Sequence, residues 1–178
     1  MNFPVIDNLI KDVNESKEID KSDWKEFVLI KLFPRYFHGS RLKKSDRKPG
    51  NTPLVTAGQQ NNGISDYVTP PTKNVVYSNC ITIDMFGNCF YHDYEFICDD
   101  NVYPITGIPS KNVGLFLCAV IHNEINYTFK KQFREKELKL VKIKLPVSNE
   151  NPDWNFMENY IVELQEKLLK KLFSDSDK

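Results

Sequence analysis

The stretch PLVTAGQQNNGISDYV, residues 53–68, contains the clearest local signal in the chain. Two short segments with β-branched or aromatic residues, 53–58 and 64–68, flank four consecutive side-chain amides. Strands are depleted in Asn and Gly, and a row of amides leaves no apolar face for a sheet. We therefore predict two strands joined by a longer polar loop. Because Asn-Gly is a common turn dipeptide, an ordinary polar turn is one reading of this loop.

Strand signals continue on both sides of this hairpin. The segment that starts at Trp24 is predicted to be a strand ending near Pro34. Residues 75–105 are rich in β-branched and aromatic residues and contain a Gly-Asn turn, which predicts two or three strands. Apolar and basic residues alternate over 138–145, as in an edge strand.

A helix is predicted after Pro109, with Ser110 as its N-cap. It is nearly apolar all round, which indicates a buried helix. Its predicted face consists of Val113, Phe116, Leu117, Val120 and Ile121.

A second helix is predicted from Pro152, with Asn151 as N-cap and Asp153 in the first turn. Its apolar residues recur at intervals of three and four, the a/d seam of a coiled coil. The predicted dimer or partner interface consists of Trp154, Met157, Ile161, Leu164, Leu168 and Leu172. The alternative is that this stripe packs on its own domain.

Length and composition exclude several classes of protein. The 178 residues fit one domain with an appended element or two small domains, and 40% hydrophobic residues can form a core. Basic and acidic residues balance at 24 each, so overall charge indicates no partner. We see no secretory signal and no apolar run of membrane-spanning length, so we expect a cytoplasmic protein with reduced thiols.

The charge is unevenly distributed along this neutral chain. Residues 74–110 contain no Lys or Arg and five carboxylates. Residues 41–48 carry five basic residues against one Asp, a net +4, and residues 128–144 carry seven against two Glu, a net +5. Two such segments can create a local positive surface.

A metal site is one alternative for the cysteines. Cys80, Cys89, His92 and Cys98 follow the spacing C-x8-C-x2-H-x5-C. Structural zinc sites usually take close ligand pairs from turns, and only the Cys89–His92 pair has that spacing. We therefore favour small buried thiols on strands.

Catalytic alternatives have weaker support. Cys118 and His122 share a helix face, but a catalytic thiol requires an electropositive, partly exposed site. Asp84 and Glu95 could pair on a metal as in a nuclease, but no Lys follows Glu95 where such a site would need one. No phosphate-binding glycine motif is present.

The alternative interpretation of the amide loop is that it recognises DNA bases. Asn and Gln bond adenine edges bidentately, Arg and Lys bond guanine, and cations hold phosphates. The basic and aromatic stretch 127–139 is open to the same two readings, a DNA contact or a solvated edge.

The order of four segments resembles the DNA-specificity (S) subunit family of type I restriction-modification systems and the similar modules of fused restriction-modification enzymes. The resemblance spans residues 23 to 172. The segments are the opening Trp24-Lys25 strand, TPLVTAGQQNNGISDYV, NVGLFLCAVIHNEI with YTFKKQFREKELKLVKIKLPV, and PDWNFMENYIVELQEKL.

The resemblance implies a non-catalytic reader with an α+β fold. We expect an arm or short helix at 1–22, a target-recognition domain at 23–150 with a twisted, mostly antiparallel sheet, a coiled-coil spacer helix at 151–173, and a tail at 174–178. Expected partners are double-stranded DNA, a methyltransferase (modification) subunit that carries S-adenosylmethionine, and a restriction subunit. No cofactor or metal is expected in this chain.

Twelve side chains are the predicted DNA contacts. The basic ones are expected to hold the backbone, and the amides to read bases or to form a structural turn that the family shares. They are Arg41, Lys43, Lys44, Arg47, Lys48, Gln59, Gln60, Asn61, Asn62, Lys130, Lys131 and Arg134.

Family members usually have two recognition domains and two long helices, whereas this chain has one of each. It is then a half-size subunit that dimerises, an excised domain, or an orphan reader. A helix over 153–173 would be about 31 Å long at ~1.5 Å per residue. Antiparallel two-fold pairing would set two readers about 34 Å apart, one DNA turn, on an inverted repeat. The rival hypothesis is a protein-interaction scaffold that uses the Leu-rich helix without DNA readout.

Overall fold

The predicted hairpin is present in the computed structural model, which describes residues 19–125, 127 and 130–174. Strand β2 (Pro49–Val55) pairs antiparallel with β3 (Ile64–Val68). The two-residue strand β6 (Ile97–Cys98) pairs parallel with β2 and completes a three-stranded sheet of order β3-β2-β6. The hairpin therefore has a paired strand on only one side.

A second three-stranded sheet forms the centre of the fold. It has the order β5-β4-β7, with β4 (Cys80–Asp84), β5 (Cys89–His92) and β7 (Val102–Ile105) all antiparallel. The segment predicted to hold two or three strands thus holds four, counting β6. A strand of two residues shows no alternation, which is why the sequence pattern did not separate it.

Only the four residues after Trp24 form a strand, although a strand was predicted as far as Pro34. Strand β1 (Lys25–Val28) pairs with β8 (Lys142–Leu145), and the chain then enters the one-turn helix α2 (Leu29–Leu32). The predicted continuation to Pro34 is wrong because the helical turn places Leu29 and Phe33 on one side, where both are buried. The edge strand predicted over 138–145 is confirmed only at Lys142–Leu145, where both lysines are exposed, because Leu138 ends a one-turn helix instead.

Helix α3 (Lys111–Glu124) begins at the predicted cap, where the Ser110 hydroxyl accepts a 3.1 Å hydrogen bond from the Val113 amide. It is buried on one face, not all round, and Leu115 is 36% exposed on the other. At Gly114 a β-carbon would lie 2.3 Å from the ring of Tyr91, so glycine allows α3 to approach β5 closely. One-turn helix α4 (Glu135–Leu138) follows before β8.

Helix α5 (Trp154–Ser174) is capped by Asp153, whose carboxylate accepts a 2.9 Å hydrogen bond from the Phe156 amide. The predicted cap at Asn151 is wrong, because β10 (Asn151–Pro152) pairs with β9 (Val147–Ser148) in a two-stranded ribbon. The helix therefore starts two residues later than its proline signal indicated.

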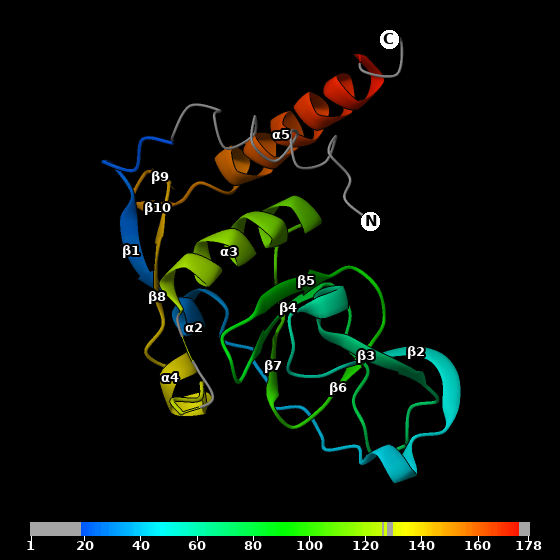
Figure 1. Cartoon of the computed structure of the whole chain (residues 1–178). Coiled ribbons are helices and arrows are strands. Elements are labelled where there is room, and N and C mark those ends of the chain that lie inside the picture. Colours follow the sequence, from blue (N-terminus) through cyan, green and yellow to red (C-terminus); the bar gives the residue numbers. More distant parts are fainter. Residues whose placement is uncertain (1–18, 126, 128–129, 175–178) are drawn as a thin grey trace.

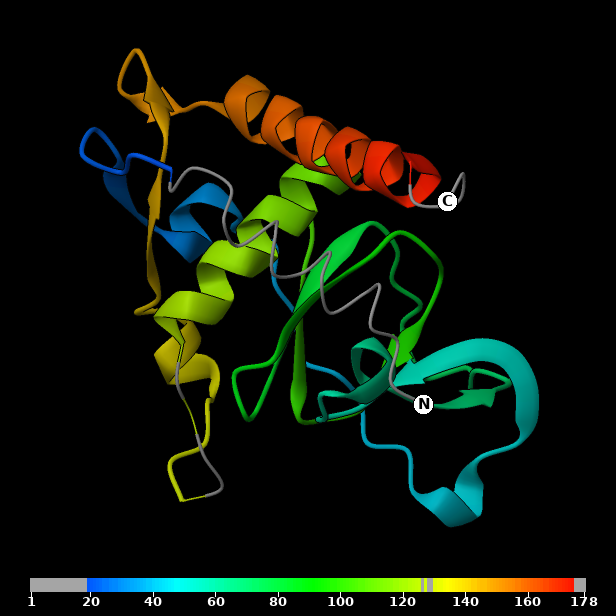
Figure 2. The same ribbon diagram turned by 45° about the horizontal axis from the view of Figure 1, so that its top comes forward.

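Helix α3 lies between α5 and the β5-β4-β7 sheet, and the β2–β3 hairpin lies on the side of that sheet away from α5 (Figures 1 and 2). The main core gathers around α3, β8 and the start of α5, and two smaller clusters pack beneath β2. The fold is thus α+β and mostly antiparallel, but the residues that the structure describes form four small sheets instead of one.

Two predicted segments lie partly outside the described residues, namely most of the arm at 1–22 and the tail at 174–178. Within the described part of the chain, no helix combines the length and apolarity needed to cross a membrane.

Candidate nucleic-acid interface

The amide loop is an exposed turn with left-handed backbone. The short 3-10 element η2 (Gln60–Gly63) contains Asn61 at φ 49° and Asn62 at φ 52°, and Gly63 has φ 80°. Asn is among the few non-glycine residues that adopt this conformation readily. All four amide side chains, from Gln59 to Asn62, are exposed. The loop therefore combines a structural turn with amide groups that face solvent.

The buried carboxylate of Asp84 holds this loop in place. Its oxygens accept hydrogen bonds from the Gly58 amide at 2.8 Å, from the Phe86 amide at 2.8 Å, and from both the backbone and side chain of Asn88 at 3.0 and 2.7 Å. Asp84 is 4% exposed. Since four donors saturate this carboxylate, its role is to join the amide loop to the β4–β5 turn, and not to bind a metal with Glu95.

The basic loop 41–48 contains two kinds of cation. Lys43, Lys44 and Lys48 are exposed, around the single-turn helix η1 (Lys44–Asp46). Arg47 has 19% of its side chain exposed and pairs with Asp66 at 3.4 Å. Arg47 therefore ties the loop to β3, and the lysines are the groups that face solvent.

The second basic segment shows the same division. Lys130 and Lys131 are exposed, and the Lys131 ammonium lies 5.7 Å from the centre of the Tyr127 ring. The Arg134 guanidinium instead donates hydrogen bonds to the side chains of Asn101, at 3.0 Å, and Gln132. Arg134 thus holds this segment against the turn between β6 and β7.

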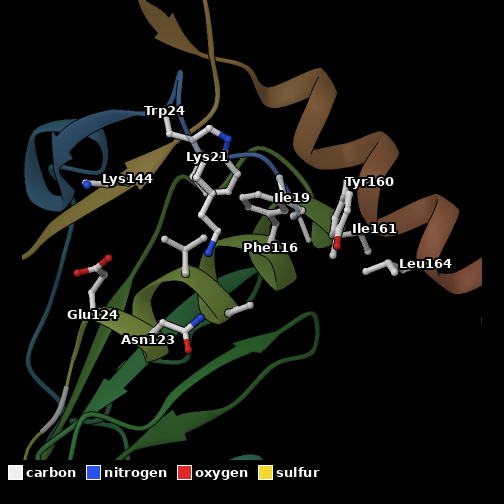
Figure 3. Close-up of a pocket in the computed structure, with 12 residues that line it drawn as sticks. Ile19, Lys21, Trp24, Phe116, Asn123, Glu124, Lys144, Tyr160, Ile161 and Leu164 are labelled. Carbon is white, nitrogen blue, oxygen red and sulfur yellow. The ribbon is translucent and has the colours of Figure 1, made fainter. Parts of the chain in front are cut away.

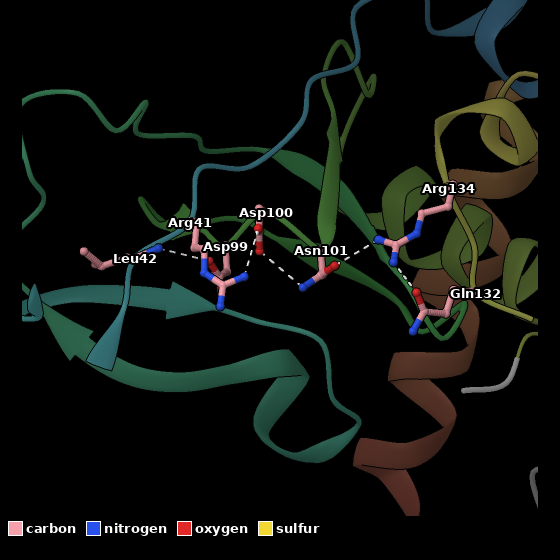
Figure 4. Close-up of polar contacts among 7 residues, drawn as sticks. All are labelled: Arg41, Leu42, Asp99, Asp100, Asn101, Gln132 and Arg134. Atoms are coloured by element: carbon pink, nitrogen blue, oxygen red, sulfur yellow. Dashed lines mark hydrogen bonds and ion pairs between the residues drawn. The ribbon is translucent and has the colours of Figure 1, made fainter. Parts of the chain in front are cut away.

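Polar contacts of the turn 99–101 link the two basic segments, as Figure 4 shows. Arg41 pairs with Asp100 at 3.6 Å, Asn101 donates to Asp100 at 3.2 Å, and Arg134 donates to Asn101. The Asp99 carboxylate accepts from the Leu42 amide at 3.0 Å. The acidic stretch therefore positions Arg41 on one side of it and Arg134 on the other.

The amide loop connects to the same place. Because β2 pairs with β6, the Asp99 amide donates a 2.9 Å hydrogen bond to the Val55 carbonyl, just before the loop begins. A polar cavity of about 370 Å³ then separates the loop from the end of α3. Gln59, Asn88, His122, Asn123 and Tyr127 line it, so it reaches from the amide loop to the ring beside Lys131.

The cysteine and histidine group is part of the core. His92 is fully buried, and its two ring nitrogens lie 2.9 Å from the hydroxyls of Thr82 and Tyr94. Burial lowers its pKa to about 4, with the nearby Asp93 charge opposing that shift. Burial also raises the pKa of the Cys80 thiol to about 12 and raises those of Cys89 and Cys98. Both nitrogens of His92 thus contact hydroxyl groups, and the three thiols are buried in the core clusters.

The predicted seam of α5 divides into two halves. Met157 is fully buried, and Trp154 and Ile161 pack against the core, so the first half contacts its own domain. The prediction that Met157 contacts a partner is therefore wrong. Leu168 is half-buried and Leu172 is 45% exposed, so the second half lies open.

An apolar groove of about 290 Å³ marks the change between these halves (Figure 3). It lies where α3, α5 and the segment before β1 meet, with Trp24, Phe116, Tyr160 and Leu164 on its walls. Leu164 therefore lies beside α3, and the seam residues beyond it extend past that helix.

Comparison with known proteins gives a consistent result. The family model of the type I restriction modification DNA specificity domain matches residues 21–173. The specificity subunit S.BcgI of a type II restriction enzyme from Heyndrickxia coagulans is 30% identical over 176 residues, covering 94% of this chain and 50% of that subunit.

Solved structures show the same fold. The S subunit of a type I restriction-modification system from M. genitalium superposes with a TM-score of 0.59 at 16% identity, covering 97% of this chain and 45% of that one. The HsdS subunit from Thermoanaerobacter tengcongensis gives 0.55 at 12% identity, covering 96% and 46%. The chain thus spans about half the length of these relatives.

Proposed function

The chain belongs to the type I restriction-modification DNA specificity domain family, and from this we propose that it is a non-catalytic reader of duplex DNA. It selects the site at which a restriction-modification complex acts. The convergence of three segments carries this proposal: the basic loop 41–48, the segment 130–134 and the amide loop all meet at the turn 99–101 and its neighbouring strands.

The exposed lysines and the amides have different roles in this reader. Lys43, Lys44 and Lys130 hold phosphates, because they are exposed and flexible point charges. Gln59 and Gln60 test base edges, since they present amides without a left-handed backbone to maintain. Asn61 and Asn62 form the turn and present their amides from it.

The chemistry is supplied by partner subunits. A methyltransferase subunit that binds S-adenosylmethionine docks on this chain and modifies adenine, and a restriction subunit joins that complex. The open second half of α5, from Leu164 to Leu172, contacts either a second copy of this chain or a partner helix. A second copy would provide the second recognition domain that relatives of twice the length have room for.

Salt-dependent DNA binding by the purified chain, alone and with its modification subunit, tests the reader. Lys43→Ala is expected to weaken binding to all sequences and to reduce the slope of log K against log salt by about 1. Gln60→Ala is expected to change the preferred bases at a cost of about 1–3 kcal/mol. Lys31→Ala on α2 is the matched control, since Lys31 is an exposed lysine outside both basic segments and outside α5.

The rival hypothesis, a protein-interaction scaffold, predicts the opposite result for DNA binding. A scaffold would bind its protein partner through α5 with no sequence preference on DNA. The scaffold would be favoured over the reader if, with the modification subunit present, the wild-type chain bound all duplexes equally and Gln60→Ala bound DNA as wild type does.

A further inference from the structure

We propose that the cavity between the basic loop and the turn 69–73 binds one phosphate of the DNA backbone, and that Lys73 and Thr72 are DNA contacts. This inference rests on the proposed function and extends its interface. Neither residue belongs to the two basic segments, and Lys73 stands alone in a turn between two strands.

The cavity has a volume of about 290 Å³ and lies at the end of the basic loop. One wall carries Asp46 and Lys48, and the other carries Thr69, Thr72 and Lys73. Two lysines, Lys48 and Lys73, thus line one hollow from segments that are more than 20 residues apart in sequence. A tetrahedral anion with several acceptor oxygens suits donors that converge from two sides.

Backbone contacts hold the two walls together. The Thr69 amide donates to the Lys48 carbonyl at 2.8 Å, and the Thr69 hydroxyl donates to the Pro49 carbonyl at 2.8 Å. A β-carbon at Gly50 would lie 2.4 Å from the Thr69 amide nitrogen, so the walls approach as closely as they do only because residue 50 is glycine. The spacing of the site is therefore fixed before any ligand arrives.

The turn that carries Lys73 is anchored as well. The Asn74 amide donates to the Pro71 carbonyl at 2.9 Å, which closes a turn with Thr72 and Lys73 at its centre. The Asn74 side chain is 9% exposed and donates to the Ser40 carbonyl at 3.4 Å, next to Arg41. This contact fixes the turn against the start of the basic loop.

The charges of the cavity are not neutralised internally. Among the described residues, neither Lys48 nor Lys73 forms an ion pair, whereas Arg41 and Arg47 both do. Asp46 is the only carboxylate on the described walls, and its carboxylate accepts from the Ser45 hydroxyl at 2.9 Å. The Thr69 hydroxyl already donates elsewhere, so Thr72 is the hydroxyl that can donate to a phosphate.

The salt dependence of DNA binding by the full chain tests this site. Lys73→Ala is expected to reduce the slope of log K against log salt by about 1, equally for preferred and random duplexes. Lys73→Arg is expected to keep the slope, and Asp46→Asn to raise affinity. Lys31→Ala, at an exposed lysine on α2, is the matched control and should change nothing.

Neutralising single phosphates identifies the ligand. Methylphosphonate is placed at successive backbone positions of the preferred duplex. At one position it should weaken DNA binding by wild type but should not weaken binding by Lys73→Ala any further. Thr72→Val should give the same result at that position. An unchanged slope and unchanged phosphate scan in Lys73→Ala, with wild type still binding selectively, overturns this inference alone. Wild type without salt-dependent binding overturns the proposed function and the inference with it.

Discussion

At the scale of single residues, buried ionisable groups hold the loops that bear the interface. Asp84 illustrates this, since one carboxylate fixes both the amide loop and the β4–β5 turn through four donors. A buried charge is tolerated when its hydrogen bonds replace water. Asp84, which the sequence offered with Glu95 as a possible metal-binding pair of a nuclease, therefore fixes the position of the amide loop.

His92 makes the stability of the fold depend on pH. Its folded pKa is about 4 against an ordinary 6.5, because burial penalises the charged ring. The unfolded chain therefore binds more protons than the native chain between these pH values. By linkage, His92 contributes stability above pH 6.5, and that contribution falls by about 3 kcal/mol as pH drops from 6.5 to 4.

Urea denaturation at several pH values measures this contribution. We expect His92→Gln to be less stable than wild type at pH 7, because the contacts to Thr82 and Tyr94 are altered. The gap should narrow on acidification, since glutamine does not titrate. A gap of constant size from pH 7 to pH 4 would show that His92 is not the source. Because both proteins contain the same carboxylates, the effect of carboxylate titration on stability cancels in the difference between them.

At the scale of elements, α5 performs two tasks along one seam. Phe33 and Trp154 lie 6.0 Å apart between ring centres, and Phe116 and Tyr160 lie 5.8 Å apart, so the first turns are part of the domain core. Beyond the groove the helix continues with Leu169 and Leu172 about half exposed. The core therefore fixes the first half of the helix, and the proposed contact with another chain lies in its second half.

Paired truncations separate the two tasks. Met157→Ala should destabilise the fold by about 2–5 kcal/mol, because a fully buried side chain leaves a cavity. Leu172→Ala should change unfolding by less than about 0.5 kcal/mol, as surface substitutions do, and should weaken self-association. Denaturation reports the first effect and sedimentation equilibrium the second. Equal effects of both variants on stability would contradict the division of the helix.

The hairpin, the Ser110 cap and the exposed alternation of β8 could be predicted because each depends on a few neighbouring residues. Elements that depend on tertiary contacts could not. The turn of helix after β1 forms because Leu29 and Phe33 meet the core, and the two-residue β6 forms because β2 is there to pair with it. The local sequence pattern contains no information about either of these tertiary contacts.

Predictions for the interface differ in the same way. Exposure of the lysines and the left-handed turn at Asn61 and Asn62 follow from residue type. The internal pairing of Arg47 and Arg134 does not, because Asp66 and Asn101 are distant in sequence. Lys73 lacked any signal, since a lone lysine in a turn is common and only the folded chain brings it near Lys48.

At the scale of the whole molecule, some acids of this neutral chain serve as internal supports for its basic loop. Asp66 pairs with Arg47, Asp99 accepts from the Leu42 amide and Asp100 pairs with Arg41, all within the basic loop 41–48. The exposed lysines are left to face outward. The position of charges in the fold therefore matters more to the partner than their sum.

The division of α5 also changes the expected dimer. If only residues 164–173 pair, the two-fold axis crosses near residue 168 instead of residue 164. At ~1.5 Å per residue the two domains then lie about 12 Å further apart than with full overlap. A two-fold pair must read an inverted repeat. The half-sites should therefore be separated by an unselected gap, wider than full overlap of the helices would give.

Selection from random duplexes at about 150 mM salt measures this arrangement. We expect wild type to enrich a split inverted repeat, and Leu172→Asp to enrich a single half-site with the same base preferences, because a charge on the open seam separates the copies while leaving the reader intact. Lys31→Ala, at an exposed lysine on α2 outside both the seam and the basic segments, should leave both the repeat and its gap unchanged. One ungapped half-site from wild type, together with a monomer across micromolar concentrations, would exclude the dimer and retain the reader.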